Sequence, residues 1–170
     1  VSLTREVNLR QQAYGFTPLS LAPAIGNSIP GIDQIVRYTR NSMAIRYGEN
    51  IFQQGIAFTD SNFTEVFDLP MITGDAVSLK EKSNILISEE FAGICFGDEA
   101  AVGKMIKVYY GDDDERLFRV SGVFRDIPQN ASMQFNLLCL IENYIDFNNI
   151  EEHLWTDWIA ATFLMIRDDK

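Results

Sequence analysis

The segment from Asn62 to Pro128 most constrains the fold, because it fixes backbone geometry at almost every step. Pro70, Gly74 and Gly97 each end a short apolar stretch, and such residues are typical of helix ends and turns. The same segment contains no recognisable catalytic motif. It therefore predicts short helices alternating with strands.

Helix signals are clearest at Ser88, a typical N-cap residue followed by Glu89 and Glu90, and this helix is expected to end at Gly97. Other predicted helices cover about residues 18–27, with Thr17 as N-cap, and a short stretch after Asp60 or Ser61. The predicted strands cover residues 35–39, 51–58, 84–87, 105–110, 117–124, 133–141 and 158–166, with one more around 6–9. Residues 79–82 are expected to be a polar connection, and 142–156 irregular or partly helical. This pattern predicts an α+β fold, and it leaves the strand order open.

Composition supports a folded core and argues against nucleic-acid binding. The chain has 170 residues, which suits one domain or two small subdomains, and 46% of them are hydrophobic. The net charge is −10, distributed as +2 over residues 1–58 and −12 over the remainder, and an acidic chain repels phosphate backbones. The apolar runs at 135–141 and 158–166 are shorter than the roughly 18 residues that a membrane span needs. The start at Val1, without a signal peptide, is expected of a piece of a longer protein.

The sequence predicts no catalytic residue, no cofactor and no metal ligand. His153 is the single histidine and is expected at the surface, because a triad also needs a placed nucleophile and acid. The adjacent Glu89 and Glu90 point in different directions on a helix and are expected to cap it rather than act as an acid–base pair. Cys95 and Cys139 lie among apolar neighbours and are expected to be buried, although an oxidising compartment would allow a disulfide between them. The stretch from Gly97 to Gly103 lacks a phosphate-binding pattern.

Two acidic or aromatic segments are candidates for contact with a partner. One is the hairpin tip at Asp112, Asp113 and Asp114, which is expected to be solvated, with a divalent cation as the alternative. The other contains Tyr144, Phe147 and Trp155, and it is either a loop packed over the core or a contact surface for a partner. The burial of Trp155 distinguishes these two readings.

Five blocks of residues occur in the same order as in one protein family, and they cover residues 55–140 well. They are Asp60, Phe63, Val66, Phe67, Leu69 and Pro70; Gly74 and Asp75; Ile85, Ile87, Ser88, Glu89, Ala92, Phe96 and Gly97; Gly103, Lys104 and Ile106; and Val120, Gly122, Val123, Asp126 and Pro128. In the continuation, Met133 stands where the family usually has His. In this pattern the chain resembles the extracytoplasmic core domain of MacB/FtsX-type ABC transporter permeases.

The resemblance implies a domain of mixed β-α-β units in two small subdomains, one inserted in the other. The membrane-proximal subdomain would comprise about 1–75 plus 128–170, and the inserted one about 76–127. It further implies a place on the periplasmic side of the inner membrane, between two transmembrane helices of a permease that forms a homodimer or heterodimer.

By the same resemblance, a separate cytoplasmic ATPase uses ATP, and the domain relays the resulting movement to substrate export or to a periplasmic partner protein, without catalysis of its own. The alternative is a secreted or surface-exposed protein-binding module that is not attached to a transporter. The sequence does not indicate which substrate is transported. The acidic composition would favour cationic cargo or a basic partner, and solubility explains it equally well.

Overall fold

The computed structural model describes residues 3–7, 10–14, 16–26, 28–111, 114–151, 155 and 158–166, with side chains from Phe16 onward. Strands β1 (Leu3–Val7) and β2 (Arg10–Tyr14) form an antiparallel hairpin. The remaining strands of the described residues form one mixed sheet. They are β3 (Thr17–Pro18), β4 (Ile32–Tyr47), β5 (Asn50–Thr59), β6 (Met71–Gly74), β7 (Asn84–Ser88), β8 (Met105–Tyr110), β9 (Asp114–Phe124), β10 (Leu137–Leu140) and β11 (Trp158–Ile166).

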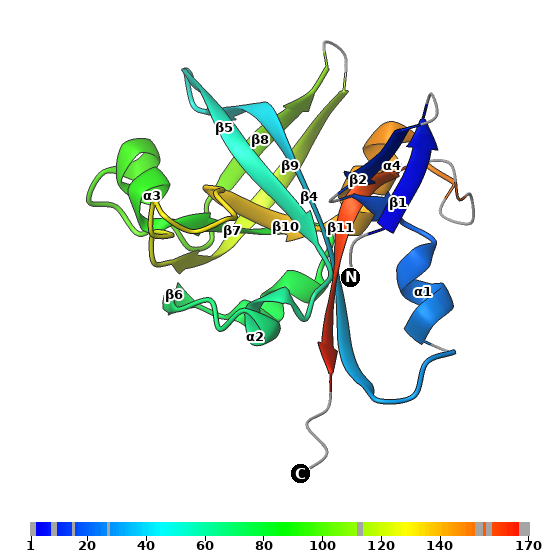
Figure 1. Ribbon diagram of the computed structural model, residues 1–170. Coiled ribbons are helices and arrows are strands. Elements are labelled where there is room, and N and C mark those ends of the chain that lie inside the picture. Colours follow the sequence, from blue (N-terminus) through cyan, green and yellow to red (C-terminus); the bar gives the residue numbers. More distant parts are fainter. Residues whose placement is uncertain are drawn as a thin grey trace.

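Part of this sheet closes on itself as a small barrel (Figure 1). Around the ring, β4 pairs with β5, β5 with β10, β10 with β7, β7 with β9 and β9 with β8. Strand β8 then pairs with β4 at Ala44, Ile45 and Arg46, which closes the ring. Closure leaves these six strands with only short stretches of free edge.

The barrel interior is filled by side chains that alternate along each strand. Every second residue belongs to one buried cluster, as expected of strands whose side chains point alternately inward and outward. The inward residues are Met43, Ile45, Ile56, Phe58, Ile85, Ile87, Ile106, Val108, Phe118, Val120, Leu137 and Cys139. The barrel is therefore a packed core and not a channel.

Two helices close the barrel at opposite ends. Helix α3 (Glu89–Phe96) follows β7 and helix α4 (Ile141–Asn148) follows β10, and these two strands run antiparallel. Phe91 of α3 and Ile145 of α4 accordingly belong to the same interior cluster. Ser88 caps α3 as predicted, because its Oγ accepts a hydrogen bond of 3.1 Å from the backbone N–H of Phe91.

A second apolar layer covers one outer side of the barrel. Ala57, Leu86 and Leu138 point outward from β5, β7 and β10 into a separate buried cluster. This cluster is covered by Phe63 from α2 (Phe63–Val66), by Leu79 from the 3-10 helix η1 (Ala76–Lys80) and by Phe135 from the loop between β9 and β10.

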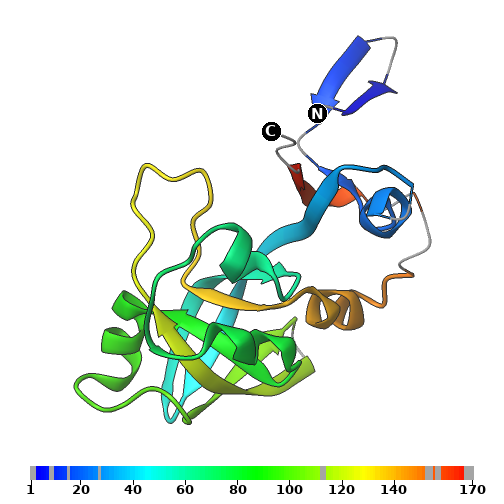
Figure 2. The ribbon, with the colours of Figure 1, turned by 90° about the horizontal axis from the view of Figure 1, so that it is seen from below.

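The first half of β4 extends beyond the barrel and forms an arm. There β11 pairs with β4 from Ile32 to Tyr38, β3 pairs with β11, and α1 (Leu21–Gly26) packs beside β4. Figures 1 and 2 show α1 and β11 on the side of the molecule opposite α3. No helix among the described residues is long and apolar enough to cross a membrane.

Most predicted elements are confirmed in kind, including the β4–β5 and β8–β9 hairpins, α3 and the last strand. The mixed sheet with few short helices agrees with the predicted α+β class. The division into subdomains stays a prediction. Strands β7, β8 and β9, from the predicted insertion at 76–127, bond to β10, β4 and β6 outside it.

Four local predictions are wrong. Thr17 does not cap a helix but pairs with β11, where its hydroxyl contacts Ala160 O at 2.9 Å, and the helix begins only at Leu21. Neither Asp60 nor Ser61 caps α2, whose N-cap position is Asn62 and has no side-chain bond. Residues 79–82 are not simply polar, because Leu79 is fully buried. The strand predicted at 133–141 is limited to β10, because residues 133–136 belong to the loop before it and α4 begins at Ile141.

The backbone at Gly74 yields a test of the β6–β9 packing. Its φ is +80°, and an added Cβ would lie 2.3 Å from Ser121 O. We expect Gly74→Ala to lower the free energy of unfolding by about 2–5 kcal/mol, from left-handed strain plus overpacking. Gly48→Ala is the matched control, because Gly48 also has positive φ but open space around it, and should lower it by about 1–2 kcal/mol. Equal losses in urea denaturation would contradict this packing.

Candidate functional site

An ion pair joins the arm to the barrel at the point where β5 ends. The Arg37 guanidinium donates to Asp60 from Nη2 at 2.6 Å and from Nε at 3.1 Å. Both side chains are largely buried, with 11% of Arg37 and 21% of Asp60 exposed. Charge-assisted, forked contacts of this kind are stronger than those between neutral groups.

The same segment satisfies the backbone of β4 after β5 has turned away. The last residue pair of the β4–β5 ladder is Tyr38 with Thr59. Beyond it, Asp60 Oδ2 accepts from the Arg37 N–H at 2.7 Å, and Thr59 Oγ1 donates to Arg37 O at 2.7 Å. Asn62 Nδ2 donates to Ile35 O at 3.2 Å. Side chains thus continue the edge of β5, and they fix the direction in which β4 leaves the barrel.

Two of the predicted contact residues, Tyr144 and Phe147 on α4, pack into the barrel end. Tyr144 lies 5.3 Å from the Phe58 ring, and Phe147 stacks on Tyr110 with ring centroids 4.4 Å apart. The Arg116 guanidinium lies 4.0 Å from the centroid of the Phe147 ring. Both rings are half-buried and help to close the barrel, and a role for them in partner contact stays a prediction.

Trp155 is a predicted contact residue that the structure leaves exposed. Its side chain is 55% exposed, and its carbonyl accepts a hydrogen bond of 3.1 Å from the indole N–H of Trp158. This exposure favours the contact reading over burial in the core, although a partner there stays a prediction.

Asp114, at the predicted acidic tip, is exposed at the start of β9, opposite Tyr110 of β8. Asp112, Asp113 and the single histidine His153 lie outside the described residues. Within the described part of the chain, no group of three or more His, Cys, Asp or Glu side chains is arranged to hold a metal ion.

Asp146 ties α4 to the barrel through two cations. Its carboxylate accepts from Lys82 Nζ and lies 3.4 Å from Arg116 Nη1. The Lys82 hydrogen bond, with a smaller contribution from Arg116, lowers the pKa of Asp146 below its ordinary value of 3.8. These contacts of Asp146 with Lys82 and Arg116 hold α4 in place, and they do not form the arrangement of converging groups that a catalytic centre needs.

Both cysteines are buried, as the sequence predicts, and they are free, which the sequence leaves open. Burial raises the pKa of the Cys95 thiol to about 11 and that of Cys139 well above its ordinary value. Because the thiolate is the nucleophile, neither thiol is activated for covalent chemistry at neutral pH.

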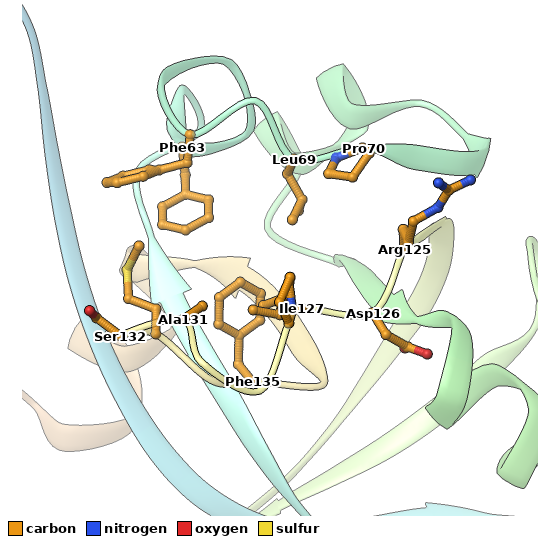
Figure 3. Close-up of a pocket in the computed structure, with 12 residues that line it drawn as sticks. Phe63, Leu69, Pro70, Arg125, Asp126, Ile127, Ala131, Ser132 and Phe135 are labelled. Atoms are coloured by element: carbon orange, nitrogen blue, oxygen red, sulfur yellow. The ribbon is translucent and has the colours of Figure 1, made fainter.

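An apolar groove of about 340 Å³ lies between α2 and the loop from Arg125 to Phe135 (Figure 3). Phe63, Leu69 and Pro70 line one side, and Ile127, Ala131 and Phe135 line the other. Arg125 and Asp126 stand at one end, and the Asp126 carboxylate accepts from the Glu90 N–H at 2.9 Å. Its lining suits an apolar group rather than a reacting polar one.

Sequence reasoning missed this groove, because residues 63–70 and 125–135 are distant in the chain and are brought together by the pairing of β6 with β9 and by contacts such as that of Phe63 with Phe135. The available signal is the apolar face of the short helix that Pro70 ends, together with Ile127 beside Pro128.

Comparison with known proteins places the chain in a family and identifies similar folds. The family model of the MacB-like periplasmic core domain matches residues 2–169. A direct search of curated proteins found no match.

Three solved structures share the fold at low identity. A domain assigned to a permease protein of Porphyromonas gingivalis has a TM-score of 0.78 and 23% identity, over 95% of this chain and 67% of that one. The periplasmic region of MacB from Actinobacillus actinomycetemcomitans has a TM-score of 0.71 and 18% identity, over 91% and 66%. The extracellular domain of the noncanonic ABC-type transporter YknZ from Gram-positive bacteria has 0.65 and 17%, over 91% and 74%. The chain therefore spans about two thirds of the length of the first two.

Removing the carboxylate at the junction should destabilise the fold. Asp60→Ala removes the forked hydrogen bonds to the largely buried Arg37 guanidinium and leaves Glu142 Oε1, at 4.0 Å, as a more distant carboxylate, so we expect the free energy of unfolding to fall by about 2 kcal/mol. The matched control is Glu49→Ala, which removes the exposed partner of Arg46 at 3.9 Å and should leave stability nearly unchanged. Similar denaturation midpoints for the two variants would show that the junction is not a stabilising contact.

The lowered pKa of Asp146 predicts a pH-dependent contribution to stability. A depressed folded-state pKa stabilises the fold above the ordinary value of 3.8, and this stabilisation is lost as the pH falls through the lower, folded-state pKa. Asp146→Asn should therefore be less stable than the parent at pH 6, with the gap closing below pH 3.8. The exposed Glu81→Gln serves as the control in urea denaturation. A difference in stability between Asp146→Asn and the parent that does not change with pH would show that the substitution acts through packing alone.

Proposed function

The chain belongs to the family of MacB-like periplasmic core domains, and on this basis we propose that it relays ATP-driven movement from an ABC transporter permease into the periplasm. The coarser assignment, a periplasmic domain of a MacB/FtsX-like permease, follows from the family match and agrees with the shared fold. In the proposal, the permease is anchored in the inner membrane, forms a homodimer or heterodimer, and works with a separate cytoplasmic ATPase that uses the ATP.

The observation that carries the relay is the continuity of β4. This strand has 16 residues, long for a globular protein, and spans about 50 Å at the usual rise of a strand. It pairs with β11 in the arm and then with β5 and β8 in the barrel. A displacement of the arm is therefore transmitted along one hydrogen-bonded strand to the barrel wall.

Two further features support a stiff body. The barrel is closed and filled, and packed interiors deform little. The Arg37–Asp60 contact holds β4 at the point where its pairing with β5 ends. A relay needs this stiffness, because a soft junction would absorb the movement before it reached α3 at the far end.

The proposal assigns no catalysis to this domain, and its periplasmic output is substrate export or contact with a partner protein. A secreted protein-binding module remains the competing function, and an intact gene without membrane spans on either side of this segment would favour it.

Distance measurements in the intact permease test the relay. Spin labels at Ile29→Cys in the arm and Asp98→Cys after α3 measure a distance within one domain. A label at Asp98→Cys alone measures the distance between the two copies of a dimer. Both positions are exposed, whereas Cys95 and Cys139 are buried and should stay unlabelled. We expect ATP to change the distance between copies and to leave the distance within the domain unchanged.

Protein without the added cysteines is the control for labelling. An inter-copy distance that is the same with and without ATP would overturn the relay. An intradomain distance that changes as much as the inter-copy one would overturn its rigidity.

A further inference from the structure

One wall of the barrel is left uncovered and carries exposed aliphatic side chains. On β5, β4, β8 and β9, the residues that point away from the interior form cross-strand rows. Ile51 pairs with Arg46, Arg46 with Lys107, and Lys107 with Leu117. Beside this row, Met105 pairs with Arg119. Ile51 is 65%, Met105 43% and Leu117 53% exposed, so three large apolar side chains lie on one exterior wall.

This wall, here called the basic face (Ile51, Arg46, Lys107, Leu117, Met105 and Arg119), reverses the charge of the chain as a whole. It carries three cations within two neighbouring rows, whereas the protein has a net charge of −10. A fourth cation, Arg40, lies farther along β4 over Gly55, where an added Cβ would be only 2.8 Å from its guanidinium. The absence of a side chain at Gly55 leaves room for the Arg40 guanidinium beside β5.

The arrangement of the charges is unfavourable for the isolated fold. Arg46 and Lys107 are direct cross-strand neighbours, and like charges opposite one another destabilise a sheet. Two acids partly offset them, because Lys107 pairs with Glu115 at 2.7 Å and Arg46 lies 3.9 Å from Glu49. Arg119 and Arg40 have no carboxylate within ion-pair distance among the described residues. The basic face therefore retains positive charge that an acidic ligand would neutralise.

We propose that the basic face is a docking surface for an acidic polypeptide segment that carries aliphatic side chains. The cations select the charge of the partner, and Ile51, Met105 and Leu117 supply apolar area between them. Along the row, the cations Arg46 and Lys107 lie between the aliphatic Ile51 and Leu117 on strands about 4.8 Å apart, so a segment laid across these strands meets both kinds of group. This inference rests on the proposed function, since it specifies the chemistry of the periplasmic partner, and it opposes the basic partner that composition alone would favour.

Defined peptides test the surface on the chain alone, without ATPase or transport. The probe is a fluorescein-labelled 12-residue peptide that repeats Glu-Leu-Leu-Glu, and its binding is followed by fluorescence anisotropy at low salt. A Lys-Leu-Leu-Lys repeat reverses the charge, and a Glu-Ser-Ser-Glu repeat removes the aliphatic groups. We expect the acidic aliphatic peptide to bind at least tenfold more tightly than either, with affinity falling as salt is raised.

Charge reversal at the surface locates the binding. The double variant Arg46→Glu/Lys107→Glu should weaken binding at least tenfold, and Leu117→Ser should weaken it severalfold at unchanged charge. Lys80→Glu, on the exposed side of η1, is the matched control and should bind like the parent. Melting curves that match the parent's show that each variant is folded.

Several outcomes would overturn the proposal. These are no binding of the acidic peptide, equal binding of the charge-reversed peptide, or an affinity that Arg46→Glu/Lys107→Glu leaves unchanged. Tighter binding to vesicles of phosphatidylcholine with one quarter phosphatidylglycerol would identify an anionic lipid surface instead. Dimerisation of the chain in light scattering, abolished by the double variant, would identify a second copy as the occupant. None of these results bears on whether the permease relays movement, so the two proposals fail separately.

Discussion

The three residue pairs between β4 and β8 are the contact on which the architecture depends. Without them the sheet would stay open, and the side chains of β8 and β9 that now face the interior would face water. With them, the interior cluster around Ile45, Val108 and Phe118 is enclosed and fully buried. Helices α3 and α4 can then act as plugs, because a closed barrel has two ends and β7 and β10 deliver one helix to each. Hydrophobic burial supplies the free energy of folding, and strand pairing determines which side chains are buried.

Strand β4 links this barrel to everything outside it. Its second half belongs to the barrel, and its first half forms the arm with β11. The change of partner occurs at Arg37, where a strand edge would otherwise lose its hydrogen bonds. Asp60 and Thr59 replace them with side-chain contacts, and the ion pair adds a second constraint on the same residue. A junction that is bonded in this way transmits displacement, which is the property that the proposed relay requires.

Charge shows how poorly composition describes a surface. The chain is acidic overall, yet strand register brings Arg46, Lys107 and Arg119 together on one wall from positions far apart in sequence. Elsewhere cations are used locally, as when Lys82 and Arg116 hold Asp146 on α4. A net charge reports the sum of these arrangements, whereas a partner meets one face at a time.

The sequence by itself determined the local elements. Ser88 and Gly97 bounded α3, the short strands at 84–87 and 117–124 were predicted in place, and the order of motif blocks pointed to the family that the whole-chain match confirms. These signals are local, because a cap or a short strand is encoded within a few residues. Tertiary structure alone decided the barrel closure, the use of Asp60 at the junction, the groove between α2 and the 125–135 loop, and the basic face. Each of these joins residues that are distant in the chain, and strand order and register, which a single sequence does not encode locally, set which of them meet.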